Sequence, residues 1–157
     1  MGGVGAVEEL FVREYPRLVR ALGTAFDPEA AADAVQEAFI EADRRWRTIS
    51  GYEDPAAWVR RVALNRLLTG QRNQRRRAEI LATIRPVAPD DLTADQLDLR
   101  RAVASLPDRM RLAVCLHYLA DLRIEDVAAA MDIAPGTVKS TLHDARRRLR
   151  PLLAELP

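Results

Sequence analysis

The segment from Ile124 to Leu149, IEDVAAAMDIAPGTVKSTLHDARRRL, constrains the fold of this chain more than any other. On both sides of a break at 132–135, apolar residues recur three, four and seven positions apart, which predicts two amphipathic helices. Two short helices around a tight turn form a helix-turn-helix, whose second helix can enter a DNA major groove. The two predicted stripes consist of Ile124, Val127, Ala128 and Met131, and of Val138, Leu142, Ala145 and Leu149.

Polar residues gather on the second helix opposite its apolar stripe. They are Lys139, Ser140, His143, Asp144 and Arg147, flanked by Arg146, Arg148 and Arg150. A solvated charged face is the ordinary explanation for such a run, and this segment alone does not separate that explanation from DNA binding. The rest of the chain has to decide between them.

Composition predicts an all-α protein without a membrane span. Hydrophobic residues make up 48% of the 157 residues and aromatic residues only 5%, and no apolar stretch approaches the roughly 20 residues that cross a bilayer. The N-terminal sequence MGGVGAVEEL lacks a basic segment followed by an apolar one, so no export signal is expected. The single cysteine, Cys115, excludes an intramolecular disulfide framework. We expect a cytoplasmic protein.

The net charge of +1 conceals a division of the chain into three parts. Residues 1–77 carry a net charge of +2, residues 78–99 carry −4 and residues 100–157 carry +3. Periodicity fades after about residue 78, where prolines and aspartates appear, as is typical of a linker or of a frayed helix followed by a linker. We therefore predict two small helical domains, 1–77 and 95–157, joined by an acidic flexible linker at 78–94. Weakly basic domains and an acidic connector suit nucleic-acid contact by the domains alone.

The second helix of the first domain carries an unusual polar face. The helix is predicted over 28–46, after an N-cap at Asp27 and a proline at its first position. An isoleucine among charged residues suits a partner surface, although scattered exposed apolar side chains are common. We call this set the Ile40 face: Asp33, Gln36, Glu37, Ile40 and Arg44.

The next helix, from Pro55, is apolar over most of its circumference and keeps one narrow polar line. Aromatic rings stack on bases, arginines hold phosphates and amides pair with base edges, so this line is equipped to bind unpaired nucleotides. The alternative is a tryptophan in the core beside solvated arginines. The polar line consists of Trp58, Arg61, Asn65, Thr69 and Arg72.

The sequence contains no pattern that predicts catalysis. Paired carboxylates, a nucleophile beside a base and a glycine-rich phosphate loop are all missing from it. His117 has no Cys, His or carboxylate at a ligand spacing, so we interpret it as a helix-packing residue. No enzymatic activity, metal or cofactor is expected.

Three segments together resemble the extracytoplasmic-function sigma factors of bacterial RNA polymerase. They are DAVQEAFIEADRRW, DPAAWVRRVALNRLL and SLPDRMRLAVCLHYLADLRIEDVAAAMDIAPGTVKSTLHDARRRL. The segment GTVKS occurs in many helix-turn-helix regulators, but the motif at Asp33–Glu37 ahead of it makes the pair specific. The resemblance covers residues 7–77 and 95–153.

The resemblance implies a role for each polar set. The Ile40 face would bind the coiled coil of the core polymerase clamp, and the polar line would capture the melted minus-ten strand, with a base held near the 48–54 loop. The helix from Pro135 would read the duplex minus-thirty-five element, partly through backbone amides at its N-terminus. An anti-sigma factor acting in trans is also expected. The residues implied to contact the minus-thirty-five element, here called the reading face, are Thr137, Lys139, Ser140, His143, Arg146 and Arg147.

Five positions depart from the family pattern. Arg123 and Ala134 replace the usual capping serines, each at a cost of about 1 kcal/mol, although Pro135 partly offsets the second loss. Asp132 replaces a turn glycine and tolerates a left-handed backbone less well. Thr141 and Asp144 stand where arginine is usual, which removes phosphate contacts unless Asp144 accepts from a cytosine amino group.

Two other functions remain open from the sequence. One is a helix-turn-helix regulator that binds duplex DNA without polymerase, although such a protein has no use for the Ile40 face. The other is a sigma-like interaction protein that has lost productive DNA binding.

Overall fold

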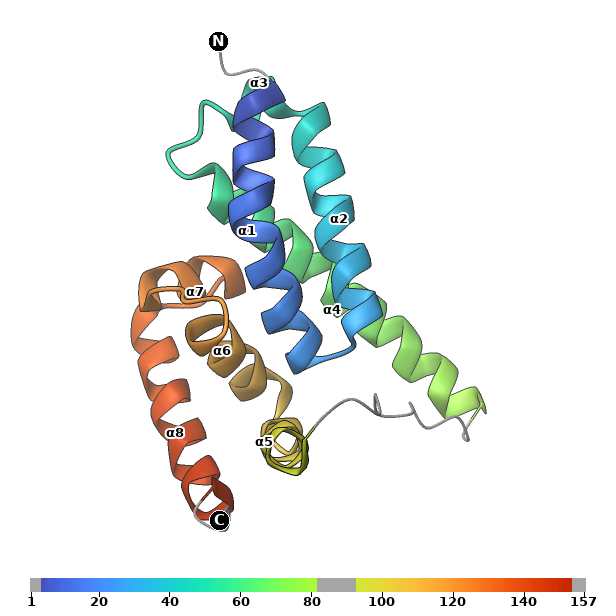
Figure 1. Cartoon of the computed structure of the whole chain (residues 1–157), viewed down its shortest axis with the longest axis vertical. Helices are drawn as coiled ribbons and strands as arrows, with labels where there is room; N and C mark the ends of the chain where they lie inside the picture. Colours follow the sequence, from blue (N-terminus) through green and yellow to red (C-terminus); the bar gives the residue numbers. More distant parts are fainter. Residues whose placement is uncertain (1–3, 82–92, 154–157) are drawn as a thin grey trace.

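The computed structural model describes residues 4–81 and 93–153, and within these ranges it contains helices and short connections but no strand (Figure 1). This confirms the predicted all-α fold. The helices are α1 (Val4–Ala25), α2 (Pro28–Arg44), α3 (Trp46–Ile49), α4 (Pro55–Leu81), α5 (Ala94–Ala104), α6 (Asp108–Tyr118), α7 (Ile124–Met131) and α8 (Pro135–Leu153).

We call helices α1 to α4 the first lobe and helices α5 to α8 the second lobe. In the first lobe, α2 packs against both α1 and α4. The connection from α1 to α2 is tight, since a Cβ added to Gly23 would lie 3.2 Å from the Cα of Pro28. Asp27 caps α2 as predicted: its Oδ2 accepts a hydrogen bond from the Ala30 amide at 2.8 Å. Asp54 caps α4 in the same way, accepting from the Ala57 amide at 3.3 Å. Both caps satisfy an amide that the helix itself leaves unpaired.

The helix predicted over 28–46 ends two residues early. α2 stops at Arg44, Arg45 has φ −107° and ψ 17°, and Trp46 begins the one-turn helix α3. The Arg45 amide donates to the carbonyls of both Glu41 and Asp43, which tightens the last turn and turns the chain. Trp46 therefore belongs to α3, where it is half-buried against the core, and does not continue the buried stripe of α2.

The second lobe contains the predicted helix-turn-helix. α7 and α8 pack on each other, and α6 packs against α8. Val138 and Leu142 on α8 are almost completely buried, as the periodicity predicts. Asp132 follows α7 with φ 57° and ψ 47°, so the chain makes its turn through a left-handed residue that is not glycine.

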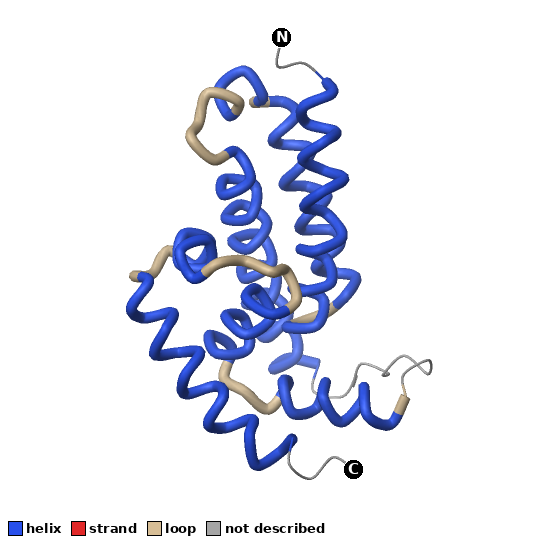
Figure 2. Tube along the Cα trace, turned by 60° about the vertical axis from the view of Figure 1, so that its left-hand side comes forward, coloured by secondary structure: helices blue, strands red, loops and turns tan. Residues whose placement is uncertain are grey.

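The two lobes pack directly on each other (Figures 1 and 2). α6 lies against α1, α7 lies against α4, and the buried side chains of both lobes form one continuous cluster. The guanidinium of Arg111 on α6 lies 5.0 Å from the ring centre of Phe26 in the first lobe, a cation–π contact. Most of the expected linker, residues 82–92, lies outside the described residues.

Candidate functional site

The Ile40 face is exposed along one side of α2. All five of its side chains are exposed, and Ile40 has 45% of its surface accessible. The opposite side of the same helix is closed, because Ala34, Val35 and Phe39 are buried against the neighbouring helices. Helical periodicity alone therefore separates the core side of α2 from a polar side that contains an isoleucine.

Arg66 joins this face to α4. Its Nη1 donates to Glu37 Oε2 and its Nη2 to Glu41 Oε2, both at 2.8 Å. The hydrogen bond from Arg66 lowers the pKa of Glu41 below its usual value of 4.5, and that bond in turn raises the pKa of Arg66. One member of the Ile40 face, Glu37, is thus already oriented by α4.

The polar line runs along the exposed side of α4, as predicted. Arg61, Asn65, Thr69 and Arg72 are all exposed. The Thr69 hydroxyl donates to the Asn65 backbone carbonyl at 2.9 Å, so this hydroxyl is paired within α4. The sequence left open whether Trp58 is a core residue or a ring available for stacking on bases. Trp58 is half-buried: it packs against the core and still leaves part of its surface accessible.

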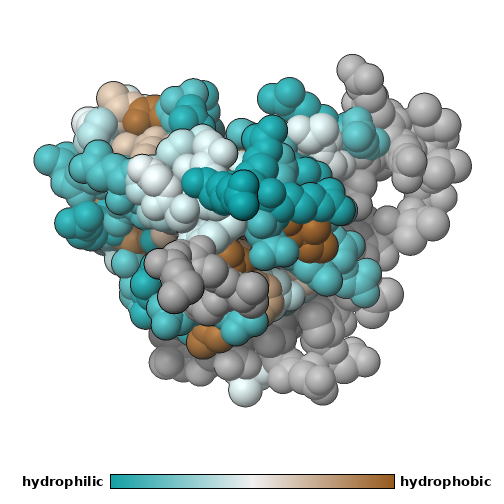
Figure 3. All heavy atoms as spheres, turned by 90° about the horizontal axis from the view of Figure 1, so that it is seen from above, coloured by the Kyte–Doolittle hydropathy of each residue, from teal (hydrophilic) through white to brown (hydrophobic). Residues whose placement is uncertain are grey.

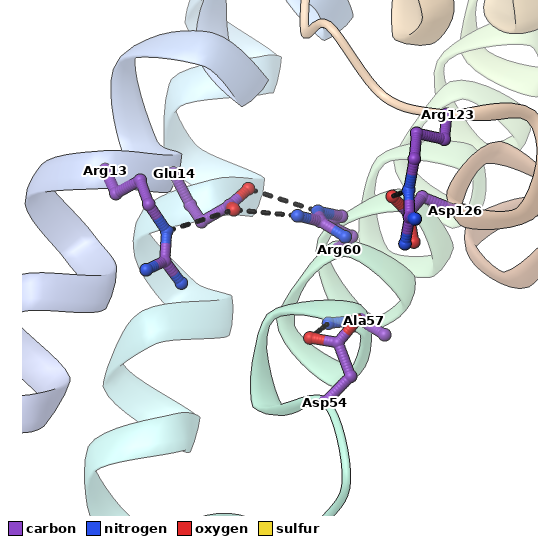
Figure 4. Close-up of polar contacts among 7 residues, drawn as sticks. All are labelled: Arg13, Glu14, Asp54, Ala57, Arg60, Arg123 and Asp126. Atoms are coloured by element: carbon purple, nitrogen blue, oxygen red, sulfur yellow. Dashed lines mark hydrogen bonds and ion pairs between the residues drawn. The ribbon is translucent and has the colours of Figure 1, made fainter.

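An ion pair ties α4 to α1 close to the polar line (Figure 4). Arg60 Nη2 lies 2.7 Å from Glu14 Oε1, and Arg60 Nε lies 3.1 Å from Glu14 Oε2. These two residues are the buried charged side chains among those the structure describes, at 9% and 4% exposure. The paired geometry fixes the rotation of α4 relative to α1 and so sets where the polar line points.

Arg61 on the polar line is paired with the helix-turn-helix. Its Nη2 lies 2.6 Å from Oδ1 of Asp132, the left-handed residue after α7. Both side chains remain accessible, at 49% and 79% of their surface. This pair brings together one residue of each lobe, which the sequence did not predict.

The reading face is exposed on α8. All six of its side chains are accessible, and Thr141 beside it is half-buried while Asp144 is exposed. Arg146 Nη1 donates to the Tyr118 hydroxyl at 2.8 Å, which orients its guanidinium. The Thr137 amide donates to the Ala134 carbonyl at 3.0 Å, so a phosphate at this helix end would be left with the Thr137 hydroxyl and the Gly136 amide.

Sequence reasoning missed the side chains that connect these sets: Glu14, Arg60, Arg66, Glu41 and Asp132 as an ion-pair partner. One signal was available. Glu37 and Glu41 are acids four positions apart on one helix, and like charges at that spacing destabilise a helix unless a cation lies near them. Nothing in the periodicity names Arg66 as that cation.

Cys115 and His117 lie on α6 in the second lobe. Cys115 is buried, and burial raises the pKa of its thiol to about 12, which keeps it protonated. His117 contacts the Leu122 carbonyl through Nδ1 at 2.8 Å, as expected for a helix-packing residue. Among the residues that the structure describes, no cluster of His, Cys, Asp and Glu could hold a metal. No helix in that part of the chain is long and apolar enough to span a membrane.

Two family models match the chain. Residues 10–77 match Sigma-70 region 2, and residues 96–149 match Sigma-70 region 4. The first match contains the Ile40 face and the polar line, and the second contains the helix-turn-helix.

Curated relatives carry sigma factor names. The chain is 36% identical over 128 residues to the RNA polymerase sigma-E factor of Streptomyces coelicolor, covering 79% of this chain and 72% of the relative. It is 33% identical over 156 residues to the ECF RNA polymerase sigma factor SigM of Mycobacterium tuberculosis, covering 96% of this chain and 79% of the relative.

Solved structures share the fold. The sigma factor RpoE of Bartonella quintana, in complex with the anti-sigma factor NepR, superposes with a TM-score of 0.81 at 24% identity, covering 98% of this chain and all of the other. CnrH in complex with the cytosolic domain of CnrY gives a TM-score of 0.69 at 23% identity, covering 99% and 92% of the two chains. The chain therefore belongs to the extracytoplasmic-function sigma factors, which direct bacterial RNA polymerase to initiate transcription at promoters.

Proposed function

We propose that this sigma factor divides its binding between two domains. Residues 1–77 bind core polymerase and the minus-ten element, residues 78–94 connect, and residues 95–157 bind the minus-thirty-five element. The observation that carries the proposal is that three polar sets, on α2, α4 and α8, are exposed while the opposite sides of the same helices are buried.

The Ile40 face is the proposed contact with the coiled coil of the polymerase clamp. A helix that presents one apolar side chain amid charges fits recognition of another helix, since the apolar side chain supplies buried area and the charges supply register. The bidentate tie from Arg66 to Glu37 and Glu41 holds α2 against α4, so the surface is rigid before it binds.

The variant Ile40→Asp tests this contact. Placing a charge at the centre of the interface removes apolar burial and adds a desolvation cost, so binding to core polymerase should fall by at least about 100-fold. Co-purification with core polymerase and the circular dichroism of the free protein give the two measurements. The matched control is Val12→Asp, which changes another exposed apolar side chain, on α1, that is 72% accessible. Equal core binding by Ile40→Asp and the control contradicts the assignment.

The polar line is the proposed minus-ten contact. A single-stranded segment needs cations for its phosphates, a π surface for stacking and amides for base edges. On α4, Arg61 and Arg72 supply the cations, Trp58 supplies the π surface and Asn65 supplies the amide. The loop expected over 48–54 is shorter in the structure, residues 50–54, because α3 includes residues 48 and 49. Tyr52 in this loop is 45% exposed, which supports stacking of an unpaired base on its ring.

The reading face is the proposed minus-thirty-five contact. Lys139, Ser140 and His143 are placed for base edges, while Arg146 and Arg147 are placed for phosphates. The hydrogen bond that Arg146 donates to the Tyr118 hydroxyl supports this division, because a guanidinium held in place loses less freedom when it binds a phosphate.

Three further statements belong to the proposal. The protein acts by binding, without catalytic chemistry of its own, and it works in the cytoplasm, where core polymerase and promoters are found. It also has an anti-sigma partner, which is supported by the solved sigma factor RpoE of the same fold, captured with the anti-sigma factor NepR.

A further inference from the structure

Asp132 occupies a position where its backbone is unfavourable. Its φ of 57° and ψ of 47° lie in the left-handed region, which glycine adopts without steric cost and other residues do not. The turn gives no local reason for a carboxylate there, since the Asp132 and Ile133 amides both donate to the Ala128 carbonyl through the backbone. The contact that distinguishes an aspartate from a glycine is the ion pair with Arg61.

Arg61 belongs to the polar line, where it is placed to hold a phosphate of the minus-ten strand. A guanidinium pairs with a carboxylate and with a phosphate through the same donors. The carboxylate of Asp132, with its Oδ1 2.6 Å from Arg61 Nη2, therefore stands where a phosphate oxygen would bind. The packing of α7 against α4 places the helix-turn-helix beside the same helix.

We propose that Asp132 is an internal competitor of promoter DNA, which holds Arg61 and keeps the two lobes together until the minus-ten strand displaces it. The inference rests on the function proposed above for the polar line. It also accounts for the departure from the family glycine at this position, because the carboxylate contributes a contact that glycine cannot make.

The expected effect is small and depends on salt. An ion pair with both side chains accessible changes an equilibrium by a factor of about two to five. Most of the cohesion between lobes comes from the apolar packing of α1 with α6 and of α4 with α7. Accessible charges are screened at about 1 M salt, so the contribution of Asp132 should vanish there.

The test measures the distance between lobes in the full-length protein. Fluorescent labels on cysteines introduced at Ser50 and Arg150, both exposed, report on the two lobes by energy transfer. The native Cys115 is buried and its thiol stays protonated, so it does not take up label. Asp132→Asn should raise the ratio of open to closed molecules about two- to five-fold at low salt and not at all at about 1 M salt.

Asp121→Asn is the matched control, because Asp121 lies in the same lobe with nearly the same backbone conformation, φ 55°. It should leave the ratio unchanged. A charge exchange adds a second test: Arg61→Asp and Asp132→Arg should each open the protein, and the two together should restore the closed form. If Asp132→Asn behaves like the control, or if the exchange fails to restore closure, the inference is wrong.

Promoter binding separates this inference from the proposed function. Asp132→Asn holoenzyme should bind promoter about two- to five-fold more tightly at low salt. An opened variant with unchanged promoter affinity contradicts competition for Arg61 but leaves the proposed function standing. Failure of the wild-type protein to form promoter complexes contradicts the proposed function itself.

Discussion

One buried ion pair joins two helices that lie far apart in the sequence. Glu14 and Arg60 form a bidentate pair, and each of the two residues is at least nine-tenths buried. A buried pair of this kind adds little net stability over an apolar pair, but removal of one partner leaves an uncompensated charge. Its role is therefore to fix one arrangement of α1 and α4.

The substitution Glu14→Gln tests that role. It should lower the free energy of unfolding by about 3 kcal/mol, because Arg60 keeps its charge and loses its counter-ion. Chemical denaturation monitored by circular dichroism measures the change. Glu9→Gln, on the exposed side of the same helix, is the control and should cost less than about 0.5 kcal/mol. Equal stability of the two variants would show that the pair is dispensable.

The contribution of Glu41 to the stability of the fold should depend on pH. The hydrogen bond from Arg66 holds the pKa of Glu41 below 4.5 in the folded protein. A lowered folded-state pKa means that the contribution to stability is complete above pH 4.5 and is lost as the pH falls through the folded value. Glu41→Gln should therefore lower the Tm at pH 7 and have little effect below that folded value. A difference in Tm that is the same at neutral and acid pH would exclude this cause.

Residue-scale features were only partly predictable from the sequence. The cap at Asp27 and the exposure of Ile40 follow from local patterns, and the structure confirms them. The partners of Arg60 and Arg66 lie 46 and 25 to 29 residues away, and no local rule names them. The left-handed backbone of Asp132 was indicated by its place in the turn, but its ion pair with Arg61 was not.

At the scale of elements, α4 makes contacts with several other helices and also carries the polar line. It packs against α2, receives the ion pair from α1, lies against α7 and carries the polar line. Its apolar residues cover most of its circumference, which predicted burial on more than one side. The polar line is what remains outside these contacts.

The variant Asn65→Ala tests the polar line. Loss of an exposed amide should leave the fold unchanged and impair promoter opening more than closed-complex formation, by about 10-fold, because its proposed partner is an unpaired base. Permanganate reactivity of the melted strand measures opening, and filter binding at low temperature measures the closed complex. Asn73→Ala, an exposed amide two turns further along α4, is the control. Equal permanganate reactivity in Asn65→Ala, Asn73→Ala and wild type would argue against the assignment.

Elements were predicted more completely than their ends. The helix-turn-helix follows from periodicity and a proline, and α7 and α8 begin and end where that pattern places them around the turn. The end of α2 was placed two residues too late, since the apolar stripe continues to Trp46 while the backbone turns at Arg45. Periodicity reports which side of a helix is buried and does not detect one residue leaving the helical conformation.

At the scale of the whole molecule, the two lobes are held against each other. One apolar cluster passes from the first lobe into the second, and Arg111 over Phe26 and Arg61 with Asp132 add polar contacts across the same boundary. Seen from the end of the molecule that carries α3, the part of the surface that the structure describes is mostly hydrophilic, with apolar residues in separate spots (Figure 3). The charge pattern predicted two lobes, but their packing depends on contacts between distant segments that no pattern along the chain records.

The ion pair with Asp132 occupies Arg61 of the polar line. If the polar line binds the minus-ten strand as proposed, promoter binding has to separate α7 from Arg61. The free energy of promoter binding has to offset the apolar contacts of α1 with α6 and of α4 with α7 that such a separation breaks. The proposed polymerase contact, the Ile40 face, lies on α2, whereas the first lobe meets the second through α1 and α4, so the proposed contact does not itself cover this boundary.

Transcription in vitro with purified core polymerase on a library of genomic promoters measures whether this protein directs initiation. We expect transcripts from a limited set of promoters with related minus-ten and minus-thirty-five elements, and we expect Ile40→Asp to abolish all of them. A protein that binds core polymerase but starts no transcript from any promoter would be an interaction protein that has lost productive DNA binding, and not an initiation factor.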